Sequence, residues 1–300
     1  MGLIRKEDLH SSCEEYIGKM HSNPNLLING DFQVWQRGTQ FNNSSEKPTQ
    51  YTADRWIMWS NKNSVVSNGD GWHLEWVSGG NDDLIQVVEL PKSAINSQMV
   101  LSFFINTEAG ISIKYGVNNG TSVNGSDKTQ EVTQTYTGKG HWEYVVLIIP
   151  STVPTNSKLR VYFATRQNTV GKAIKLAKIK LELGSTPTQF VPRLYAEELA
   201  LCKRYYQYGA YRGVGSLYTA SGYIYVPLDV NLRITPTLGT KSAVGVIRTA
   251  NGHADVKTIS LAGLCNNGIM LGYTHEISSP VTNTPVFWDN GRLELDAEIY

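Results

Sequence analysis

Hydrophobic and polar residues alternate with a period of two along much of the chain, which is the pattern of half-buried strands. In the stretch 178–183, Ile179, Leu181 and Leu183 fall on one side and polar residues on the other. Two further runs, 100–105 and 145–149, are almost continuously apolar, as in central strands covered on both faces. Roughly eight such strands without regular helices predict a jelly-roll β-sandwich over residues 25–190.

Turn signals separate these runs. The Asn-Gly dipeptide favours tight hairpins because both residues tolerate a positive φ. It occurs seven times, beginning at Asn29, Asn68, Asn119, Asn124, Asn251, Asn267 and Asn290. Frequent hairpins between short strands are typical of an antiparallel, mainly β protein.

A short helix is predicted to link two β regions, over residues 191–207. Pro192 can open it, and Glu197 and Glu198 sit in the early turns, where the helix dipole favours acidic groups. Lys203 and Arg204 lie near its end, where basic groups are favoured. The chain then returns to alternating runs, which predict a second, smaller antiparallel β-sandwich as a tip domain over residues 208–300.

Residues 1–24 predict a short N-terminal helix. Leu9, Cys13, Tyr16 and Met20 recur at helical spacing and form one apolar stripe. A single stripe needs a partner. It either packs on its own domain or serves for attachment to a larger assembly or for trimerisation.

Composition narrows the classes of partner. The net charge is +1, and no cluster of Lys and Arg is long enough to follow a phosphate backbone, so we expect no nucleic-acid partner. Three cysteines without a CxxC pair predict free thiols and synthesis in a reducing compartment. No apolar run approaches the length of a membrane helix, and residues 1–20 do not form a signal peptide, so we expect no membrane insertion.

Three segments carry a family resemblance: residues 25–37 (NLLINGDFQVWQR), 51–56 (YTADRW) and 180–207 (KLELGSTPTQFVPRLYAEELALCKRYYQ). Together they resemble tail fibre and receptor-binding proteins of tailed bacteriophages. The resemblance implies a carbohydrate-binding-module-like jelly roll, a variable β tip, a homotrimer, and a virion tail protein made in the host cytoplasm that binds host surface polysaccharide. Residues 1–24 would then contact other tail or baseplate proteins. Beyond residue 207 only the segments 233–236 (RITP) and 295–300 (LDAEIY) are similar, so no host specificity is implied.

The motif residues also have a local interpretation. Trp35 and Arg37 share one face of a strand-like segment, and Asp54 and Trp56 lie in a strand-like or bulged one. We predict that these four residues hold the jelly roll together.

Ligand contact is predicted at residues expected near loops, since aromatic faces stack on sugar rings and loops carry binding. Trp72 and Trp76 share the face of Leu74 and are expected to be buried, and Tyr223 and Tyr225 are expected to pack against a neighbouring subunit or the helix. The polar loops 248–254 and 276–288 are expected to contribute. The predicted ligand-binding residues are Trp59, Trp142, Tyr211, Arg212, Tyr218 and Trp288.

No enzymatic motif is present, and no catalytic residue is predicted. The carboxylate pairs Asp82–Asp83 and Glu294–Asp296 are interpreted as a solvated turn and as the polar face of a strand. A capsule depolymerase or esterase with an active site between subunits stays an alternative, as does a structural collar or adaptor protein. No cofactor is predicted. Asp31 and Glu182 are weak candidates for ligands of a structural calcium ion.

Overall fold

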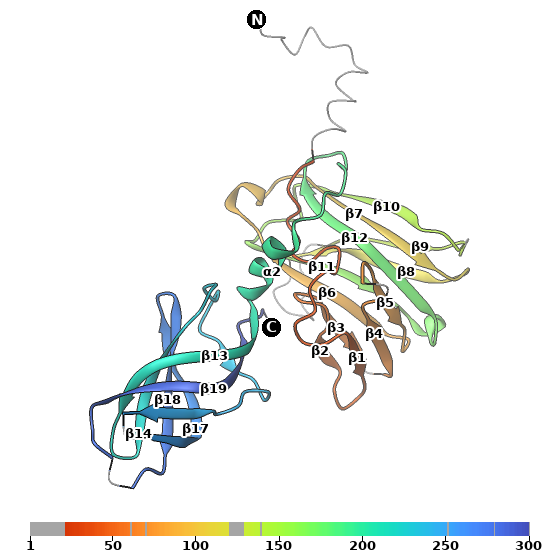
Figure 1. Cartoon of the computed structure of the whole chain (residues 1–300). Coiled ribbons are helices and arrows are strands. Elements are labelled where there is room, and N and C mark those ends of the chain that lie inside the picture. Colours follow the sequence, from red (N-terminus) through yellow and green to blue (C-terminus); the bar gives the residue numbers. More distant parts are fainter. Residues whose placement is uncertain are drawn as a thin grey trace, which may run out of the picture. The chain divides into compact units, whose positions relative to one another are not determined.

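The computed structural model describes residues 22–60, 62–69, 71–119, 129–138, 140–250, 252–278 and 280–299 (Figure 1). The chain forms two compact units that divide between Glu198 and Leu199. Both consist mainly of antiparallel strands, which confirms the predicted fold class. The predicted N-terminal helix lies outside the described residues, except for residues 22–24, which form no helix.

The first unit is a sandwich of two six-stranded antiparallel sheets. Along the chain, strands from β5 to β12 repeatedly cross from one sheet to the other, as in a jelly roll. The first sheet has the order β1 (Gln40–Asn43), β4 (Ser64–Ser67), β5 (Leu74–Val77), β12 (Ala173–Leu183), β7 (Met99–Thr107), β10 (Glu143–Ile149). The second has the order β2 (Thr49–Tyr51), β3 (Ile57–Ser60), β6 (Asp82–Glu89), β11 (Lys158–Ala164), β8 (Ser112–Asn118), β9 (Thr129–Thr135).

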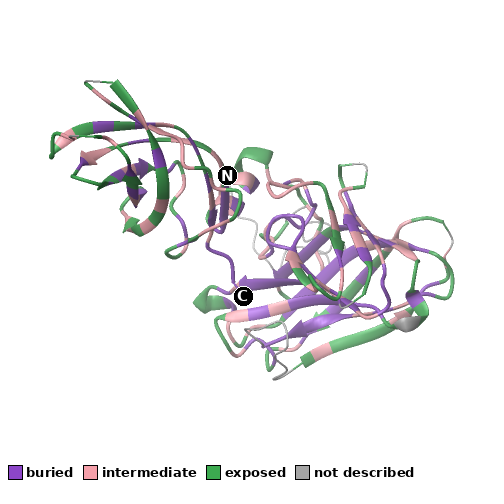
Figure 2. Ribbon diagram, turned by 90° about the horizontal axis from the view of Figure 1, so that it is seen from below, coloured by how far each residue is buried: buried purple, intermediate pink, exposed green. Residues whose placement is uncertain are grey.

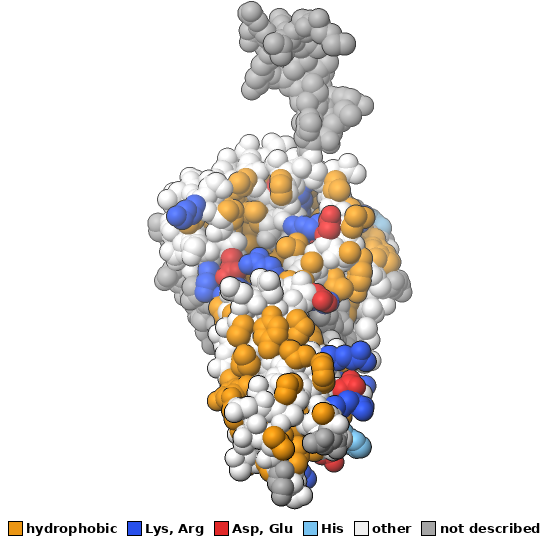
Figure 3. Space-filling view, turned by 60° about the vertical axis from the view of Figure 1, so that its left-hand side comes forward, with side chains coloured by type: hydrophobic (Ala, Val, Ile, Leu, Met, Phe, Trp, Pro, Cys, Tyr) orange, Lys and Arg blue, Asp and Glu red, His pale blue; other side chains and the backbone are white. Residues whose placement is uncertain are grey.

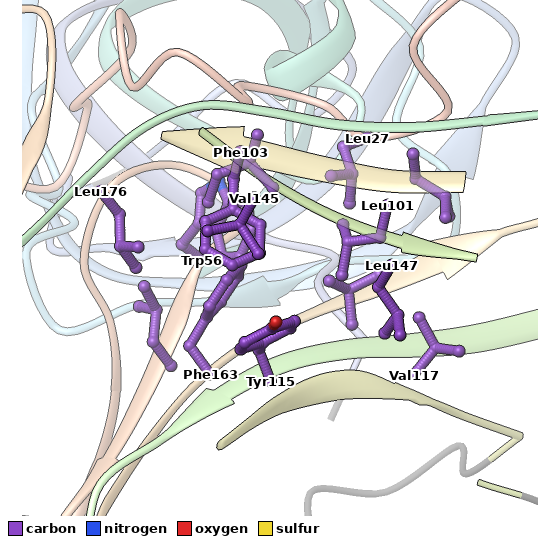
Figure 4. Close-up of a cluster of buried hydrophobic side chains, with 14 of the residues drawn as sticks. Leu27, Trp56, Leu101, Phe103, Tyr115, Val117, Val145, Leu147, Phe163 and Leu176 are labelled. Carbon is purple, nitrogen blue, oxygen red and sulfur yellow. The ribbon is translucent and has the colours of Figure 1, made fainter. Parts of the chain in front are cut away.

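The alternating positions of these strands build one core between the two sheets. Figure 2 shows the buried positions along the paired strands, and Figure 4 shows the side chains that meet there. The Phe163 ring packs 4.9 Å from Phe103 and 6.3 Å from Trp56, between ring centroids. All three side chains are fully buried. Two short 3-10 turns, η2 (Lys92–Ala94) and η3 (Gln167–Thr169), lie between strands.

The second unit is a closed antiparallel barrel, not the predicted sandwich. Its strands run in the order β13 (Tyr206–Leu217), β14 (Ser221–Pro227), β18 (Gly268–His275), β17 (Gly252–Cys265), β16 (Val246–Thr249), β19 (Thr284–Asp296). The ring closes because β19 also pairs with β13 from Tyr206 to Leu217. Closure satisfies the edges that an open sheet would expose. The short β15 (Thr237–Leu238) is added alongside β19.

The linking helix is α2 (Tyr195–Lys203), shorter than the predicted 191–207. Its first turn contains Glu197 and Glu198 and its last turn Lys203, as the dipole argument expects. Pro192 does not open it, since the helix begins at Tyr195 and its first i→i−4 hydrogen bond runs from the Glu198 amide to the Leu194 carbonyl oxygen at 3.0 Å. No helix among the described residues has the length and apolar character needed to cross a membrane.

The Asn-Gly dipeptides play two different roles. Asn267 has a φ of 58° and lies in the two-residue turn between β17 and β18, as predicted. Asn290 has a φ of 57° but lies inside β19, so the hairpin predicted there is wrong. Asp289 and Asn290 together lie opposite the single residue Arg212 of β13, which is a β-bulge.

Candidate functional site

The segments 25–37 and 51–56 meet in a buried polar cluster of the first unit. The Asn29 side chain is fully buried, donates to the carbonyl oxygens of Val34 at 2.8 Å and Asp54 at 3.0 Å, and accepts from the Val34 amide at 3.0 Å. The Trp56 indole donates to the Asn29 carbonyl oxygen at 2.9 Å, and the Asp54 carboxylate accepts from the Gln36 amide at 2.9 Å. Asp54 and Trp56 therefore hold the sandwich together.

The segment 180–207 joins the same cluster. Glu198 accepts from the Asn29 amide at 2.6 Å and pairs with Arg193 at 3.1 Å. The Asn25 side chain accepts from the Leu181 amide at 3.0 Å. The side chains of this cluster form hydrogen bonds or ion pairs with other parts of the first unit. The three segments that carry the family resemblance therefore explain how the fold is stabilised, and they do not indicate a ligand.

Asp31 and Glu182 do not form a calcium site. Glu182 is fully buried and pairs with the Lys180 ammonium at 3.1 Å, and its Oε1 accepts from the Thr188 amide at 2.8 Å. Burial raises the pKa of Asp31, and the nearby Arg193 guanidinium acts in the opposite direction. The Asp31 carboxylate accepts a hydrogen bond from the Gln33 side-chain amide, and in the described part of the chain no three His, Cys, Asp or Glu residues converge. Calcium needs six or more oxygen ligands, so these residues do not fit it.

The carboxylate pair Asp82–Asp83 is structural. Asp82 is fully buried at the start of β6 and accepts hydrogen bonds from the Trp76 indole at 3.1 Å, the Ser78 hydroxyl at 2.8 Å and the Gly79 amide at 2.8 Å. The interpretation as a solvated turn is wrong. The Asp82 carboxylate is buried and binds groups of β5 and of the loop after it, and β5 belongs to the other sheet. Burial raises the pKa of Asp83, opposed by Arg166 and Arg160.

The aromatic candidates of the sandwich are only partly accessible. Trp59 lies half-buried in β3. Trp142 is half-buried before β10, and its ring centroid lies 5.2 Å from that of Trp72. Trp72 is 45% exposed, so its predicted burial is wrong. It lies in the turn before β5 and covers the buried His73 ring at 4.9 Å instead of joining the core.

A depression of about 500 Å³ lies on the outer face of the barrel. Its centre is β19, where Phe287 pairs with Val214 of β13 on one side and with Arg248 of β16 on the other. Phe287 is 62% exposed, although it is a large aromatic residue in a regular strand. The depression is lined by Arg212, Gly213, Val214, Tyr225, Pro227, Arg248, Phe287, Trp288 and Asp289.

Trp288, one of the predicted ligand-binding residues, lines this depression but is buried beneath its surface. Its side chain is 1% exposed and its indole donates to the Val244 carbonyl oxygen at 2.6 Å. Successive residues of a strand face opposite sides, so Phe287 points out where Trp288 points in. A Cβ on Gly291 would lie 1.8 Å from the Trp288 ring, so this glycine makes room for the indole.

The bulge in β19 assembles a charged group beside Phe287. One Asp289 carboxylate oxygen forms an ion pair with the Arg212 guanidinium, 3.3 Å from Nε, and the other forms an ion pair with the Arg248 guanidinium, 3.5 Å from Nε. The Asn290 amide, followed by Arg212 and Arg248, holds the pKa of the half-buried Asp289 carboxyl below its usual value. Figure 3 shows hydrophobic side chains gathered over the second unit, at the bottom of the view, with a small basic and acidic group beside them.

Tyr211 and Tyr218 lie outside this depression. Tyr211 is half-buried in β13, and its hydroxyl donates to Gln207 Oε1 at 3.0 Å. Burial raises the pKa of Tyr211 to about 12. The Gly-rich segment that contains Tyr211 and Arg212 is therefore a strand and not the predicted loop. Tyr218 is exposed at the end of β13 and meets the exposed Tyr223 ring edge-on at 6.2 Å.

Tyr223 borders a second, smaller depression of about 280 Å³. Gly272 lies opposite Tyr223 in the register and leaves a hollow without a side chain. Hydroxyl groups surround it, and the Thr258 and Thr274 hydroxyls lie 2.7 Å apart. The residues that line it are Ser221, Gly222, Tyr223, Thr258, Ser260, Ala262, Gly272, Tyr273 and Thr274.

Among the predicted ligand-binding residues, the structure brings only Arg212 and Trp288 to one depression, and only Arg212 is accessible there. Arg248 belongs to the predicted contact segment 248–254, which forms the hairpin of β16 and β17. Phe287 lies in the other predicted contact segment, 276–288, although it belongs to strand β19 and was not singled out, and Tyr225 was assigned to packing. The alternation of Val286, Trp288 and their neighbours was a usable signal, because it places Phe287 on the opposite face.

Known proteins offer only distant likenesses to this chain. No protein-family model and no curated protein matches it. Among solved structures, it is similar to a family 61 carbohydrate-binding module in complex with β-1,4-galactotriose, at 16% identity and a TM-score of 0.34 over 54% of this chain and 99% of that one. It is also similar to the enzymatically active domain of tailspike protein 4 of bacteriophage CBA120, at 11% identity and a TM-score of 0.36 over 53% of this chain and 21% of that one.

A third similar structure is the CBM22-1 xylan-binding domain from Paenibacillus barcinonensis Xyn10C, at 13% identity and a TM-score of 0.35 over 55% of this chain and 97% of that one. At TM-scores this low, none of these likenesses carries an argument about function.

Proposed function

We propose that this chain is a non-enzymatic, glycan-binding receptor-binding protein or tail fibre of a tailed bacteriophage, which binds host surface polysaccharide through the outer face of its barrel. Two observations support the proposal. The three motif segments resemble that group of proteins, and the barrel carries an aromatic depression with hydrogen-bonding side chains at its rim. The observation that carries it is Phe287, 62% exposed within the depression of about 500 Å³.

The chemistry of the depression suits a sugar. The apolar CH face of a pyranose stacks on an aromatic ring, and polar groups around it bind the hydroxyls. Phe287 and Tyr225 supply apolar surface, while Arg212, Arg248 and Asp289 supply donors and acceptors around it. Hydrogen bonds that involve charged groups contribute more than neutral ones, so this rim favours a polar ligand over an apolar one.

Assembly as a homotrimer in the virion tail belongs to the proposal. A trimer carries several weak sites at high effective concentration, which raises the overall avidity without a strong single site. One surface that a second copy would cover is the outward row of Tyr144, Val146 and Ile148 on β10, all of which are exposed. This strand ends its sheet, with β7 as its neighbour. Attachment to other tail proteins would use residues 1–24.

The test is a glycan array of bacterial surface polysaccharides, run on the full chain beside a mass measurement of the assembly. We expect binding by an assembly of three chains, and loss of that binding in Phe287→Ala. The matched control is Ile234→Ala, which trims another exposed hydrophobic residue of the same unit outside the depression and should bind normally.

Two results would contradict the proposal. Absence of binding to every printed polysaccharide, by a correctly folded trimer, favours a structural collar or adaptor protein. Retained binding in Phe287→Ala with loss in Trp72→Ala moves the site to the first unit.

A further inference from the structure

The charged rim of the barrel depression indicates the class of glycan. We infer that the depression takes a glycan that carries an oxyanion, a carboxylate or a phosphate on the sugar, and that Arg212 and Arg248 bind this group. The inference rests on the proposed glycan-binding function and goes further, because it names the ligand chemistry and the two residues that select it.

The first argument is the charge balance of the rim. Among the residues that line the depression, Arg212 and Arg248 are the basic ones and Asp289 is the acidic one. Both guanidinium groups pair with the same carboxylate. Because the pKa of Asp289 is lowered, this carboxylate is ionised at neutral pH and contributes one negative charge against two positive ones. One positive charge therefore remains uncompensated at the rim.

The second argument is the geometry of the two guanidinium groups. Arg212 comes from β13 and Arg248 from β16, on opposite sides of β19. Each approaches Asp289 through Nε. A guanidinium has five N–H donors in a planar fork, so its terminal nitrogens stay available for a ligand. The Arg212 side chain is 87% exposed and the Arg248 side chain 54% exposed, so solvent and ligand reach both.

The third argument is the position of the charges beside the aromatic ring. Arg248 lies directly opposite Phe287 in the ladder, and the bulge at Asp289 and Asn290 places Arg212 next to the same strand. A sugar ring stacked on Phe287 would thus present a ring substituent to the guanidinium groups. Planar, charge-assisted pairing of guanidinium with carboxylate or phosphate is stronger than pairing with a neutral hydroxyl.

The experiment measures binding of the full-length assembly to three soluble polymers. Polygalacturonate carries carboxylates on its sugar rings, a phosphomannan carries phosphates on its sugar rings, and carboxyl-reduced polygalacturonate has the same backbone as the first polymer without charge. We expect at least one charged polymer to bind about tenfold or more tightly than the neutral one, since one charge-assisted hydrogen bond corresponds to about this factor. The polymer that binds distinguishes carboxylate from phosphate as the recognised group.

Three variants locate the effect. Arg212→Gln and Arg248→Gln should each weaken binding of the charged polymer about tenfold and leave the neutral one unchanged. Asp289→Asn removes the competing negative charge, so it should strengthen binding of the charged polymer and make it more sensitive to salt. The matched control is Arg166→Gln, which replaces an exposed arginine of the first unit and should leave binding of both the charged and the neutral polymers unchanged.

The inference fails if neither charged polymer binds better than the neutral one, or if Asp289→Asn abolishes binding, since the three side chains then serve only as a structural ion pair. Failure of the proposed function gives a different result. If the inference alone is wrong, glycans on the array still bind and Phe287→Ala still loses them, whereas no glycan binds at all if the proposed function is wrong.

Discussion

The buried motif cluster of the first unit and the depression of the barrel are built from the same residue types with opposite outcomes. Each contains an Asn-Gly dipeptide whose asparagine has a positive φ, a buried tryptophan and an aspartate. The Asn29 side-chain amide donates both of its hydrogen bonds to backbone carbonyl oxygens of the first unit. Near Asn290, by contrast, the side chains of Asp289, Arg212 and Phe287 reach solvent. The difference shows that recognisable motif residues can belong to the scaffold, while the proposed ligand contact lies outside the three segments that carry the family resemblance.

The largest expected effect compares the two asparagines. Asn29→Ala removes three buried hydrogen bonds from the Asn29 side chain to backbone groups of Val34 and Asp54. At about 1 kcal/mol per bond, with a further cost of about 1 kcal/mol for alanine at positive φ, we expect a loss of about 4 kcal/mol in the free energy of unfolding. Urea denaturation of the full chain, followed by tryptophan fluorescence, measures it.

Asn290→Ala is the matched control, because Asn290 has nearly the same φ but an exposed side chain. It should cost only about 1 kcal/mol for the backbone conformation. Equal losses at the two sites would show that backbone strain, and not the buried network, distinguishes the asparagines.

The scaffold was more predictable from sequence than the site. Alternation in the stretch 178–183 and the apolar run 100–105 lead directly to β12 and β7. The alternation does not give the burial of Lys180 and Glu182 on the polar side of β12, which are buried as an ion pair. Barrel closure was not predictable, since the pairing of β13 with β19 joins residues far apart in sequence. Burial of Trp288 and exposure of Phe287 depend on which face of β19 each residue occupies, and the bulge at Asp289 and Asn290 changes the alternation of faces along this strand. Arg212 was expected to be exposed in a Gly-rich loop, and its side chain is 87% exposed although the segment is a strand.

An intermediate effect is expected within the barrel, from the adjacent residues Trp288 and Phe287. Trp288→Phe removes the indole donor to the Val244 carbonyl oxygen and leaves a small cavity. We expect a loss of about 2 kcal/mol in the free energy of unfolding of the barrel. Phe287→Ala should change stability by less than about 0.5 kcal/mol, as expected for a surface substitution, while it removes glycan binding.

Thermal unfolding of both variants, with the glycan-binding measurement beside it, tests this pair. A large loss of stability in Phe287→Ala would show that its ring is part of the scaffold, and the contrast between motif cluster and depression would then fail for the barrel.

The smallest expected effect concerns Asp31, beside the motif cluster, and depends on pH. Burial raises the pKa of Asp31 in the folded state above its ordinary value, so the neutral form is favoured there. The sign follows from linkage: this group favours folding below its unfolded pKa of about 3.9, and that contribution is lost as the pH rises through the folded pKa.

Asp31→Asn removes the buried charge and should be slightly more stable than the natural chain at pH 7. The difference should vanish below about pH 4, where both side chains are neutral. Urea denaturation at pH 7 and at pH 3.5 measures the two differences, and lower stability of Asp31→Asn at pH 7 would show that the ionised carboxylate is a favourable partner of Arg193 instead of a buried cost.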